Sequence, residues 1–427
     1  MDFLVDDYIK KYGDITIAIN EAIQEASKNK GRVIFSAGKI YVSGTIYLKD
    51  DITLYFEKYA LLKMTSNKSN LLITKVNHKV SLDKPSFEDC EYDGEPKEGF
   101  IRAVNVKNIA IDGDGVIDGS EENFYGKQTK YFIDGAYYPR VPLLYFKECE
   151  NIKILNVTLR RSAFWTVHLV GSSDILIDGI HIFNNLKMAN CDGIDPDHCK
   201  NLIIRNTYIE AADDGIVFKT TRNGKKYGPC ENVEVYNCTI ISTSAGIKFG
   251  TESVSDFKNF KIHDINILRS NRGISFQLRD EGNINNINIY NIKMDLRRFC
   301  SLTYWGKAEP IAITCLNRFK DNPLGIISNV SFNNISADTE NGIFLYAIQY
   351  GKITNISFNN INLKIHKKTN WEENTHDLRP AEGYGIIEGP LNALLAKGVK
   401  NMAISKFNYE FGKEFDLIRG SDLQIID

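Results

Sequence analysis

A short pattern of polar and hydrophobic residues recurs along most of the chain. Each copy begins with a polar residue, usually asparagine, continues with alternating hydrophobic residues, and ends in a polar turn, as in KNLIIRNTY and ENVEVYNCT. Because side chains alternate between the two faces of a strand, each copy predicts a short β-strand with one face inward. The copies contain, at the fixed polar position, Asn108, Asn151, Asp174, Asn201, Asn232, Asn259, Asn286, Asn329, Asn355 and Asn401.

The spacing of the copies predicts a solenoid. Most successive copies are 23–31 residues apart, and three larger steps fit a doubled coil or a coil with an inserted loop. A βαβ fold would need a helical pattern between strands, and none is present. We therefore predict one domain over residues 1–427, a parallel-sheet solenoid in which the repeated asparagines hydrogen-bond between coils about 4.8 Å apart.

Four segments depart from the repeat. Residues 14–26 (DITIAINEAIQEA) carry hydrophobic residues at helical spacing, so we expect an amphipathic helix within a cap region, 1–30, that covers one end of the solenoid. Segments 76–100 and 366–382 are charged and lack the repeat, and 120–142 is a third insertion. We expect them to be long surface loops that wall a binding face.

Composition excludes some classes of function. The 52 basic and 54 acidic residues leave a net charge of −2 without a long basic run, so we expect no nucleic-acid partner. No hydrophobic stretch is long enough to span a membrane, and the acidic start MDFLVDDYIKKYGD does not resemble a signal peptide. We therefore expect a cytoplasmic protein, or a secreted one if a leader has been removed from this sequence. The eight cysteines are scattered, which favours buried free thiols over a zinc site.

Aspartates on consecutive coils are the strongest candidates for chemistry. Asp192 lies in NCDGID, and Asp213 and Asp214 lie in DDGIVFK, 21 residues further on. An offset of about one coil makes these residues neighbours on one face. Carboxylates held together repel one another, which raises the pKa of at least one and produces the acid and base that hydrolysis needs. One Asp-Gly pair alone would indicate an ordinary turn, but two at this offset favour a site.

These motifs resemble those of family 28 glycoside hydrolases, the polygalacturonase family, whose members carry NTDGID and DDCIAIK. The segments GKIYVSGTIYLKDDITLYFEKYALL and SAFWTVHLVGSSDILIDGIHI, which begin at Gly38 and Ser162, are also similar to that family. The resemblance implies a right-handed, single-stranded parallel β-helix of the pectin-lyase-like class. It also implies an inverting hydrolase of pectic oligosaccharides or polysaccharides that needs no cofactor and no metal.

The resemblance assigns a role to each aspartate. Asp213 would be the general acid, while Asp192 and Asp214 would hold and deprotonate the attacking water. Acid and base carboxyls of inverting enzymes lie about 6.5–9.5 Å apart. Adjacent residues of an ideal strand face opposite ways, so the backbone must bend for both Asp213 and Asp214 to serve the site, and we expect Gly215 to allow that bend.

Two motifs of the family are altered. The usual Gly-His-Gly is replaced by Ser244-Ala245-Gly246, and the usual Arg-X-Lys, which holds a galacturonate carboxylate, is replaced by Ser275 and Gln277. Displaced cations such as Lys248, Arg272 or Arg279 remain possible substitutes. This departure favours rhamnogalacturonan, xylogalacturonan or rhamnosyl substrates over plain polygalacturonate.

Further residues are candidates for substrate binding. Trp305 lies in an insertion with Glu309, where stacking and hydroxyl recognition are both possible, and Trp165 suits a sugar floor or core packing equally well. The predicted substrate-binding residues are Asn190, Lys219, Lys248, Arg279, Trp305 and Glu309.

Three functions compete at this stage. The favoured one is a pectic hydrolase, with exo action because insertions could close one end of the cleft. A polyuronate lyase on the same fold would need calcium-binding acids and a basic Arg or Lys. A carbohydrate-binding solenoid without catalysis is the third. The sequence makes no prediction of oligomeric state.

Overall fold

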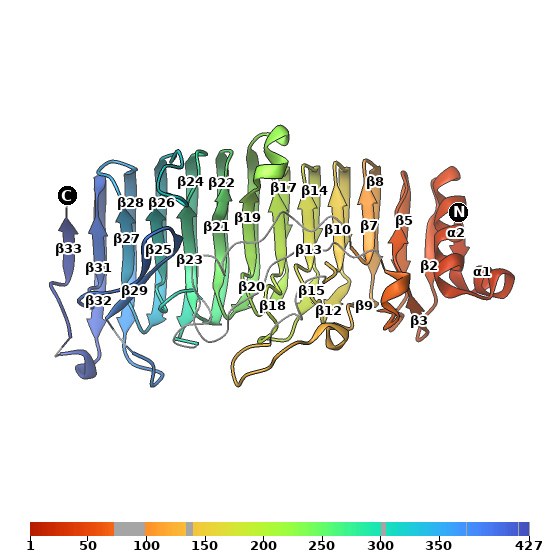
Figure 1. Ribbon diagram of the computed structural model, residues 1–427, viewed down its shortest axis with the longest axis horizontal. Coiled ribbons are helices and arrows are strands. Elements are labelled where there is room, and N and C mark those ends of the chain that lie inside the picture. Colours follow the sequence, from red (N-terminus) through yellow and green to blue (C-terminus); the bar gives the residue numbers. More distant parts are fainter. Residues whose placement is uncertain (72–98, 134–139, 300–304, 373, 417, 427) are drawn as a thin grey trace.

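The chain winds into an elongated stack of coils with two helices at its N-terminal end (Figure 1). The computed structural model describes residues 1–71, 99–133, 140–299, 305–372, 374–416 and 418–426. The strands form parallel sheets of 19 and 12 strands and one two-stranded antiparallel sheet. The predicted right-handed parallel β-helix is therefore confirmed, with the handedness that parallel crossovers almost always adopt.

The two long sheets alternate along the chain, so each coil contributes to both. The larger sheet contains β1 (Asp2–Leu4), β2 (Arg32–Phe35), β3 (Ile40–Ser43), β5 (Ile52–Phe56), β6 (Leu61–Met64), β8 (Lys107–Gly113), β9 (Val116–Asp118), β11 (Glu150–Leu155), β12 (Thr158–Arg160), β14 (Ser173–Asp178), β15 (His181–Phe183), β17 (Lys200–Arg205), β18 (Tyr208–Ala211), β20 (Cys230–Ser242), β22 (Phe257–Ser270), β24 (Ile284–Leu296), β26 (Ile327–Thr339), β28 (Ile353–Ile365) and β32 (Val399–Phe411). The smaller sheet contains β4 (Ile46–Tyr47), β7 (Ile101–Val104), β10 (Leu144–Lys147), β13 (Val167–Val170), β16 (Ile194–Asp197), β19 (Ile216–Thr220), β21 (Ala245–Ser253), β23 (Arg272–Leu278), β25 (Ile311–Cys315), β27 (Ile343–Ala347), β31 (Leu394–Lys397) and β33 (Leu423–Ile426).

The asparagine ladder is confirmed. Asn232 donates from Nδ2 to Oδ1 of Asn201 at 3.2 Å and accepts from Nδ2 of Asn259 at 3.0 Å. Asn232 also has a φ of 58°, in the left-handed region that asparagine tolerates better than most residues. A second ladder runs beside the first, for example from Asn237 Nδ2 to Asn206 Oδ1 at 2.6 Å. The repeated asparagine therefore serves both the turn and the stacking of coils.

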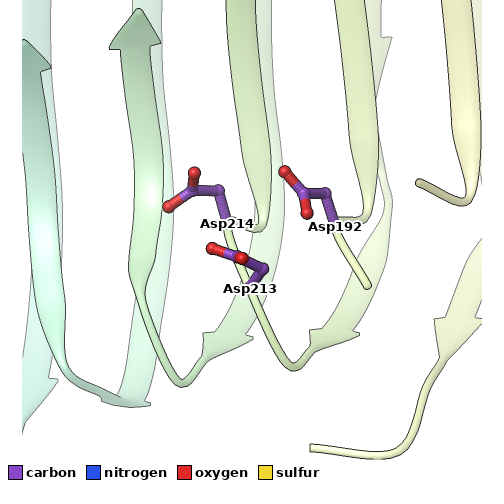
Figure 2. A group of neighbouring side chains, drawn as sticks. All are labelled: Asp192, Asp213 and Asp214. Atoms are coloured by element: carbon purple, nitrogen blue, oxygen red, sulfur yellow. The ribbon is translucent and has the colours of Figure 1, made fainter. Parts of the chain in front are cut away.

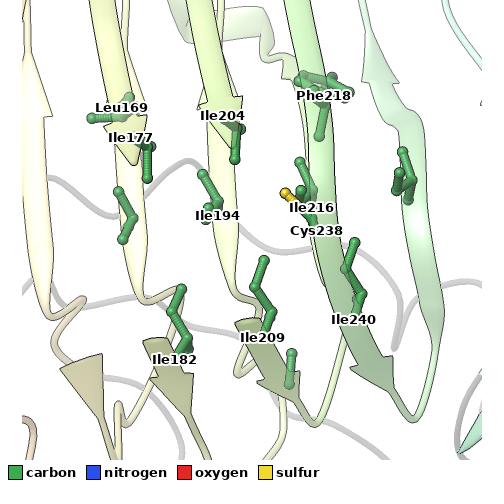
Figure 3. Close-up of a cluster of buried hydrophobic side chains, with 14 of the residues drawn as sticks. Leu169, Ile177, Ile182, Ile194, Ile204, Ile209, Ile216, Phe218, Cys238 and Ile240 are labelled. Atoms are coloured by element: carbon green, nitrogen blue, oxygen red, sulfur yellow. The ribbon is translucent and has the colours of Figure 1, made fainter. Parts of the chain in front are cut away.

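The core fills the interior of the stack. Ile194, Ile216 and Ile247 pair in register on successive strands of the smaller sheet, and all three are fully buried. Figure 3 shows how such side chains from both sheets form columns along the axis. The neighbouring residues of the same strands face outward and include Asp195 and Lys248. Charged residues therefore line the outer face of a sheet whose inner face is hydrophobic.

The predicted N-terminal helix is confirmed as α2 (Ile15–Lys28), with α1 (Val5–Tyr12) before it. The Asp14 side chain caps α2 by accepting from the backbone N–H of Ile17 at 2.9 Å. The buried face of α2, which includes Ile19 and Ile23, joins the core at the end of the solenoid. No helix of the described chain is long and apolar enough to cross a lipid bilayer.

The insertions differ from the expected surface loops. Within 366–382 lies β29 (Thr375–Ala381), a buried strand that pairs antiparallel with β30 (Tyr384–Glu388), so that part of the loop prediction was wrong. Most of the predicted loop 76–100 lies outside the described residues. The six cysteines of the described chain are free and buried, as predicted, while Cys90 and Cys300 lie outside it.

The ladder leads to a prediction for stability. We expect Asn232→Ala to destabilise the fold by about 1–3 kcal/mol, because it removes two inter-coil hydrogen bonds and places a Cβ residue without a compensating polar group in the left-handed region. Asn232→Gly keeps the backbone conformation and loses only the ladder hydrogen bonds, so its loss of stability should be smaller. Thermal unfolding of the two variants and the wild type measures both the loss of the ladder hydrogen bonds and the backbone strain. Equal melting temperatures for all three proteins would contradict this account of the ladder.

Candidate active site

Three aspartates converge at the start of neighbouring strands of the smaller sheet. Asp192 lies two residues before β16, and Asp213 and Asp214 lie in the turn before β19. The two turns are stacked, since the backbone N–H of Gly193 donates to the carbonyl of Asp214 at 3.0 Å. One oxygen from each carboxylate lies within 4.8 Å of the other two. Figure 2 shows the three side chains directed toward one region from the two turns.

The glycines beside the aspartates allow neighbouring coils to approach closely. A Cβ added at Gly193 would lie 2.4 Å from the carbonyl oxygen of Gly215, and one added at Gly215 would lie 2.6 Å from that of Gly246. Asp213 and Asp214 lie between strands, so the required departure from strand geometry is present. Gly215, however, has no left-handed φ. Its main role is close contact between coils, which differs from the bend that we predicted for it.

Asp214 is the most strongly hydrogen-bonded of the three carboxylates. Its Oδ2 accepts from the Lys248 ammonium at 2.7 Å, and its Oδ1 accepts from Ser244 Oγ at 2.8 Å and from the Ala245 backbone N–H at 3.2 Å. Burial alone would raise the pKa of Asp214, but the adjacent Lys248 outweighs it, so the pKa lies below its usual value. Asp214 is therefore ionised at neutral pH.

The other two carboxyls are shifted the opposite way. Burial and the charge of Asp214 raise the pKa of Asp213 to about 6. Burial, Asp195 and Asp213 raise the pKa of Asp192 well above its usual value. A site that combines one ionised carboxylate with carboxyls that hold protons more tightly has the components of acid–base catalysis.

Cations from successive coils lie among these acids. Lys219 Nζ lies 3.7 Å from oxygens of both Asp195 and Glu252, and 4.5 Å from the centre of the Trp165 ring. Trp165 is 2% exposed, which supports packing over a sugar floor for this residue. Each of these cations has an acidic partner, so the site mixes both signs of charge at short range.

The same three carboxylates could hold a cation. A calcium ion usually takes about six to eight oxygen ligands. The Lys248 ammonium already occupies one side of Asp214 and supplies positive charge there. The arrangement therefore fits proton transfer better than a resident metal.

Four of the predicted binding residues lie around the aspartates. Lys219 and Lys248 project from β19 and β21, and the half-buried Trp305 ring has its centre 4.8 Å from Lys248 Nζ. Asn190 lies two residues before Asp192, and its Oδ1 accepts from Arg140 Nη2 at 2.7 Å. The structure thus brings these four residues into the neighbourhood of the carboxylates.

Two predicted binding residues have internal partners and need correction. The fully buried Arg279 guanidinium donates to the carbonyls of Pro380 at 2.6 Å and Leu378 at 3.2 Å, so it anchors β29. Glu309 is also fully buried and forms a two-fold ion pair with Arg272, with both N–O distances at 3.0 Å. Neither side chain has free polar atoms directed at a substrate, because hydrogen bonds within the protein already use them.

Sequence reasoning missed Ser244 and Asp195. In the sequence Ser244 is only part of an altered motif, whereas in the structure its hydroxyl donates a hydrogen bond to Asp214. Asp195 is fully buried, and neither carboxylate oxygen has a hydrogen-bond partner among the described residues. Its signal was present in the sequence, since Asp195 occupies an outward position of a strand between the inward residues Ile194 and Pro196.

Comparison with known proteins places the chain in a family. Residues 60–378 match the model of the glycosyl hydrolases family 28. A probable polygalacturonase of Vitis vinifera is 30% identical over 245 residues, which is 55% of this chain and 47% of that protein, so the chain spans about half the length of this curated relative.

Two solved structures are similar over most of the chain. The exopolygalacturonase of Thermotoga maritima has a TM-score of 0.66 at 20% identity, covering 91% of this chain and 94% of that one. The family 28 exopolygalacturonase of Yersinia enterocolitica has a TM-score of 0.73 at 15% identity, covering 100% of this chain and 78% of that one. These likenesses show the fold. Because the family model covers residues 60–378 of 427, well over half of the sequence, the chain belongs to the glycosyl hydrolases family 28.

Proposed function

We propose that the chain is an inverting glycoside hydrolase that cleaves α-glycosidic bonds of pectic oligosaccharides or polysaccharides. The observation that carries the proposal is the convergence of Asp192, Asp213 and Asp214 within 4.8 Å, with their pKa values shifted in opposite directions. Asp213 is the general acid, because a carboxyl with a pKa of about 6 still holds its proton in mildly acidic solution. Asp192 and Asp214 hold the attacking water.

The stereochemistry rests on the family resemblance. The converging oxygens are closer together than the 6.5–9.5 Å that is typical between acid and base carboxyls of inverting enzymes. Because the nearest distances resemble the shorter spacing of about 5 Å found in retaining enzymes, distance alone does not favour inversion here. Two carboxylates that share the water remain the basis of the proposed inversion.

The charge pairing around the site supports a substrate other than plain polygalacturonate. Ser275 Oγ accepts from Arg272 Nη1 at 3.4 Å, and Gln277 Nε2 donates to the Arg379 carbonyl at 3.0 Å, so both positions of the missing carboxylate clamp have internal partners. Lys248, Lys219 and Arg272 each face an acid. A uronate carboxylate would have to displace one of these acids, whereas a neutral sugar such as rhamnose would not.

Contacts between insertions support restricted access to the carboxylates. The rings of Tyr131 and Trp371, from the insertions 120–142 and 366–382, have their centres 5.2 Å apart. They pack with Phe132, Ala189 and Phe299, close to the turn that carries Asn190. A wall built from two distant insertions supports exo action on chain ends, or action on short oligosaccharides, over attack in the middle of a polymer.

A substrate screen with a matched pair of variants tests the proposal. We expect the wild type to hydrolyse rhamnogalacturonan or rhamnosyl oligosaccharides, with kcat/KM at least about tenfold higher than on plain oligogalacturonates. Asp213→Asn should reduce hydrolysis by about 10²–10⁴-fold, the usual contribution of a general acid, while the exposed Asp114→Asn should match the wild type.

Three results of this screen would overturn parts of the proposal. An active Asp213→Asn enzyme would remove the acid assignment, and a preference for plain oligogalacturonates would remove the substrate assignment. Unsaturated products that absorb near-ultraviolet light would identify a lyase instead.

The raised pKa of Asp213 predicts how stability changes with pH. A carboxyl whose native pKa is raised binds more protons in the folded state than in the unfolded state between its two pKa values. Its contribution to stability is therefore full below about pH 4, is lost as the pH rises, and makes the ionised form destabilising above about pH 6. We expect Asp213→Asn to unfold at a higher temperature than the wild type at pH 7, with the difference shrinking toward pH 4. Thermal melts at pH 4 and pH 7 test this. A gain in Tm of the variant over the wild type that is smaller at pH 7 than at pH 4 would contradict it.

A further inference from the structure

Both carboxylate oxygens of Asp214 accept hydrogen bonds. Lys248 binds Oδ2 at 2.7 Å, and Ser244 and the Ala245 N–H bind Oδ1. The Lys248 ammonium also lies 4.8 Å from the centre of the Trp305 ring. The Lys248 side chain is only 6% exposed. Its charge is therefore directed at Asp214 and is shielded from the solvent.

Lys248 has no other charged neighbour along its row of the sheet. In the adjacent strands it pairs with Val217 and Ser275, which carry no charge. Loss of either member of such a buried pair leaves an uncompensated charge, which is costly. The other ionisable groups whose charges affect the carboxylates of the site, or one another there, are Asp192, Asp195, Asp213, Lys219 and Arg272.

Asp192 has a contrasting environment. It is 3% exposed, and its Oδ1 has no hydrogen-bond partner among the described residues. A buried carboxylate oxygen without a donor accepts a proton more readily than one held by an ammonium, a hydroxyl and an N–H. Of the two carboxylates that would share the attacking water, only Asp192 thus has an oxygen available for the proton.

We propose, building on the proposed hydrolase function, that Lys248 is a positioning residue that holds Asp214 as a permanently ionised anchor for the water, leaving Asp192 to take the proton. In this step the water oxygen forms the bond to the anomeric carbon while the glycosidic bond breaks. The proton of Asp213 goes to the departing oxygen, and the proton of the water goes to Asp192. Exchange with solvent then restores both carboxyls.

Kinetics of two substitutions at one position test this role. Lys248→Met should lower kcat by about 100-fold with KM changed less than about threefold, because Asp214 loses its fixed charge and position. The pKa of Asp214 should rise by about 1–3, since an ammonium no longer favours its ionised form, and NMR titration of the Asp214 carboxyl measures this rise. Lys248→Arg keeps the charge and should retain the lowered pKa of Asp214.

A matched control and the contrary outcomes complete the kinetic test. Lys261 forms a similar ion pair with Glu234 at 2.7 Å, but on the exposed surface of the larger sheet, so Lys261→Met should leave both kcat and the pKa of Asp214 unchanged. A raised KM with unchanged kcat in Lys248→Met would show that Lys248 binds the substrate. An unchanged pKa of Asp214 in Lys248→Met would show that Lys248 does not act through Asp214.

A thermal-unfolding cycle tests the link between the two residues without any substrate. Lys248→Met should lower Tm at pH 7 by roughly 3–8 °C, because the buried Asp214 carboxylate loses its nearest opposite charge. The double variant Lys248→Met/Asp214→Asn should recover most of that loss, since both charges are gone. Additive losses would overturn the positioning role even if the wild type is active. A wild type that hydrolyses none of the substrates would overturn the proposed function, and with it the catalytic role of Lys248, whatever the result of the cycle.

Discussion

Backbone hydrogen bonds between coils determine which residues of this protein become neighbours. Each turn that carries the carboxylates bonds to the next one, as from the Gly193 N–H to the Asp214 carbonyl and from the Gly215 N–H to the Ala245 carbonyl. Such close stacking leaves no room for a Cβ at Gly193 or Gly215. Residues separated by one coil in sequence therefore meet at fixed distances, and the site has a rigid framework of backbone to hold it.

This stacking concentrates charge on one side of the sheet. The inward residues of the strands form the core, so polar chemistry lies at the outward positions and in the turns between the strands. Asp195, Lys219 and Lys248 occupy such positions on three consecutive coils. Acids and cations lie close together there, and burial strengthens the effect of each on its neighbours. Asp213 and Asp214 are adjacent in sequence, yet their pKa values shift in opposite directions. Burial and the charge of Asp214 raise the pKa of Asp213, whereas Lys248 lowers that of Asp214.

Periodic features were predictable from the sequence, whereas contacts between insertions were not. The alternation of hydrophobic residues and the asparagine repeat predicted the coils and the ladder, because both depend on local spacing. The one-coil offset predicted that Asp192 lies near Asp213. No spacing rule indicated that Arg279 anchors β29 or that Glu309 pairs with Arg272, because these partners come from segments outside the repeat. A charged residue in a loop-rich segment looks the same in sequence whether it binds a substrate or a carbonyl of its own chain.

The central claim is that two carboxylates activate one water while Asp213 protonates the departing oxygen, and the configuration of the first product tests it most directly. Proton NMR during early hydrolysis of an α-linked pectic oligosaccharide would follow the anomeric signals before mutarotation mixes them. The account predicts that the β-anomer appears first, because a single displacement by water inverts the configuration. Initial formation of the α-anomer would show retention and would contradict it.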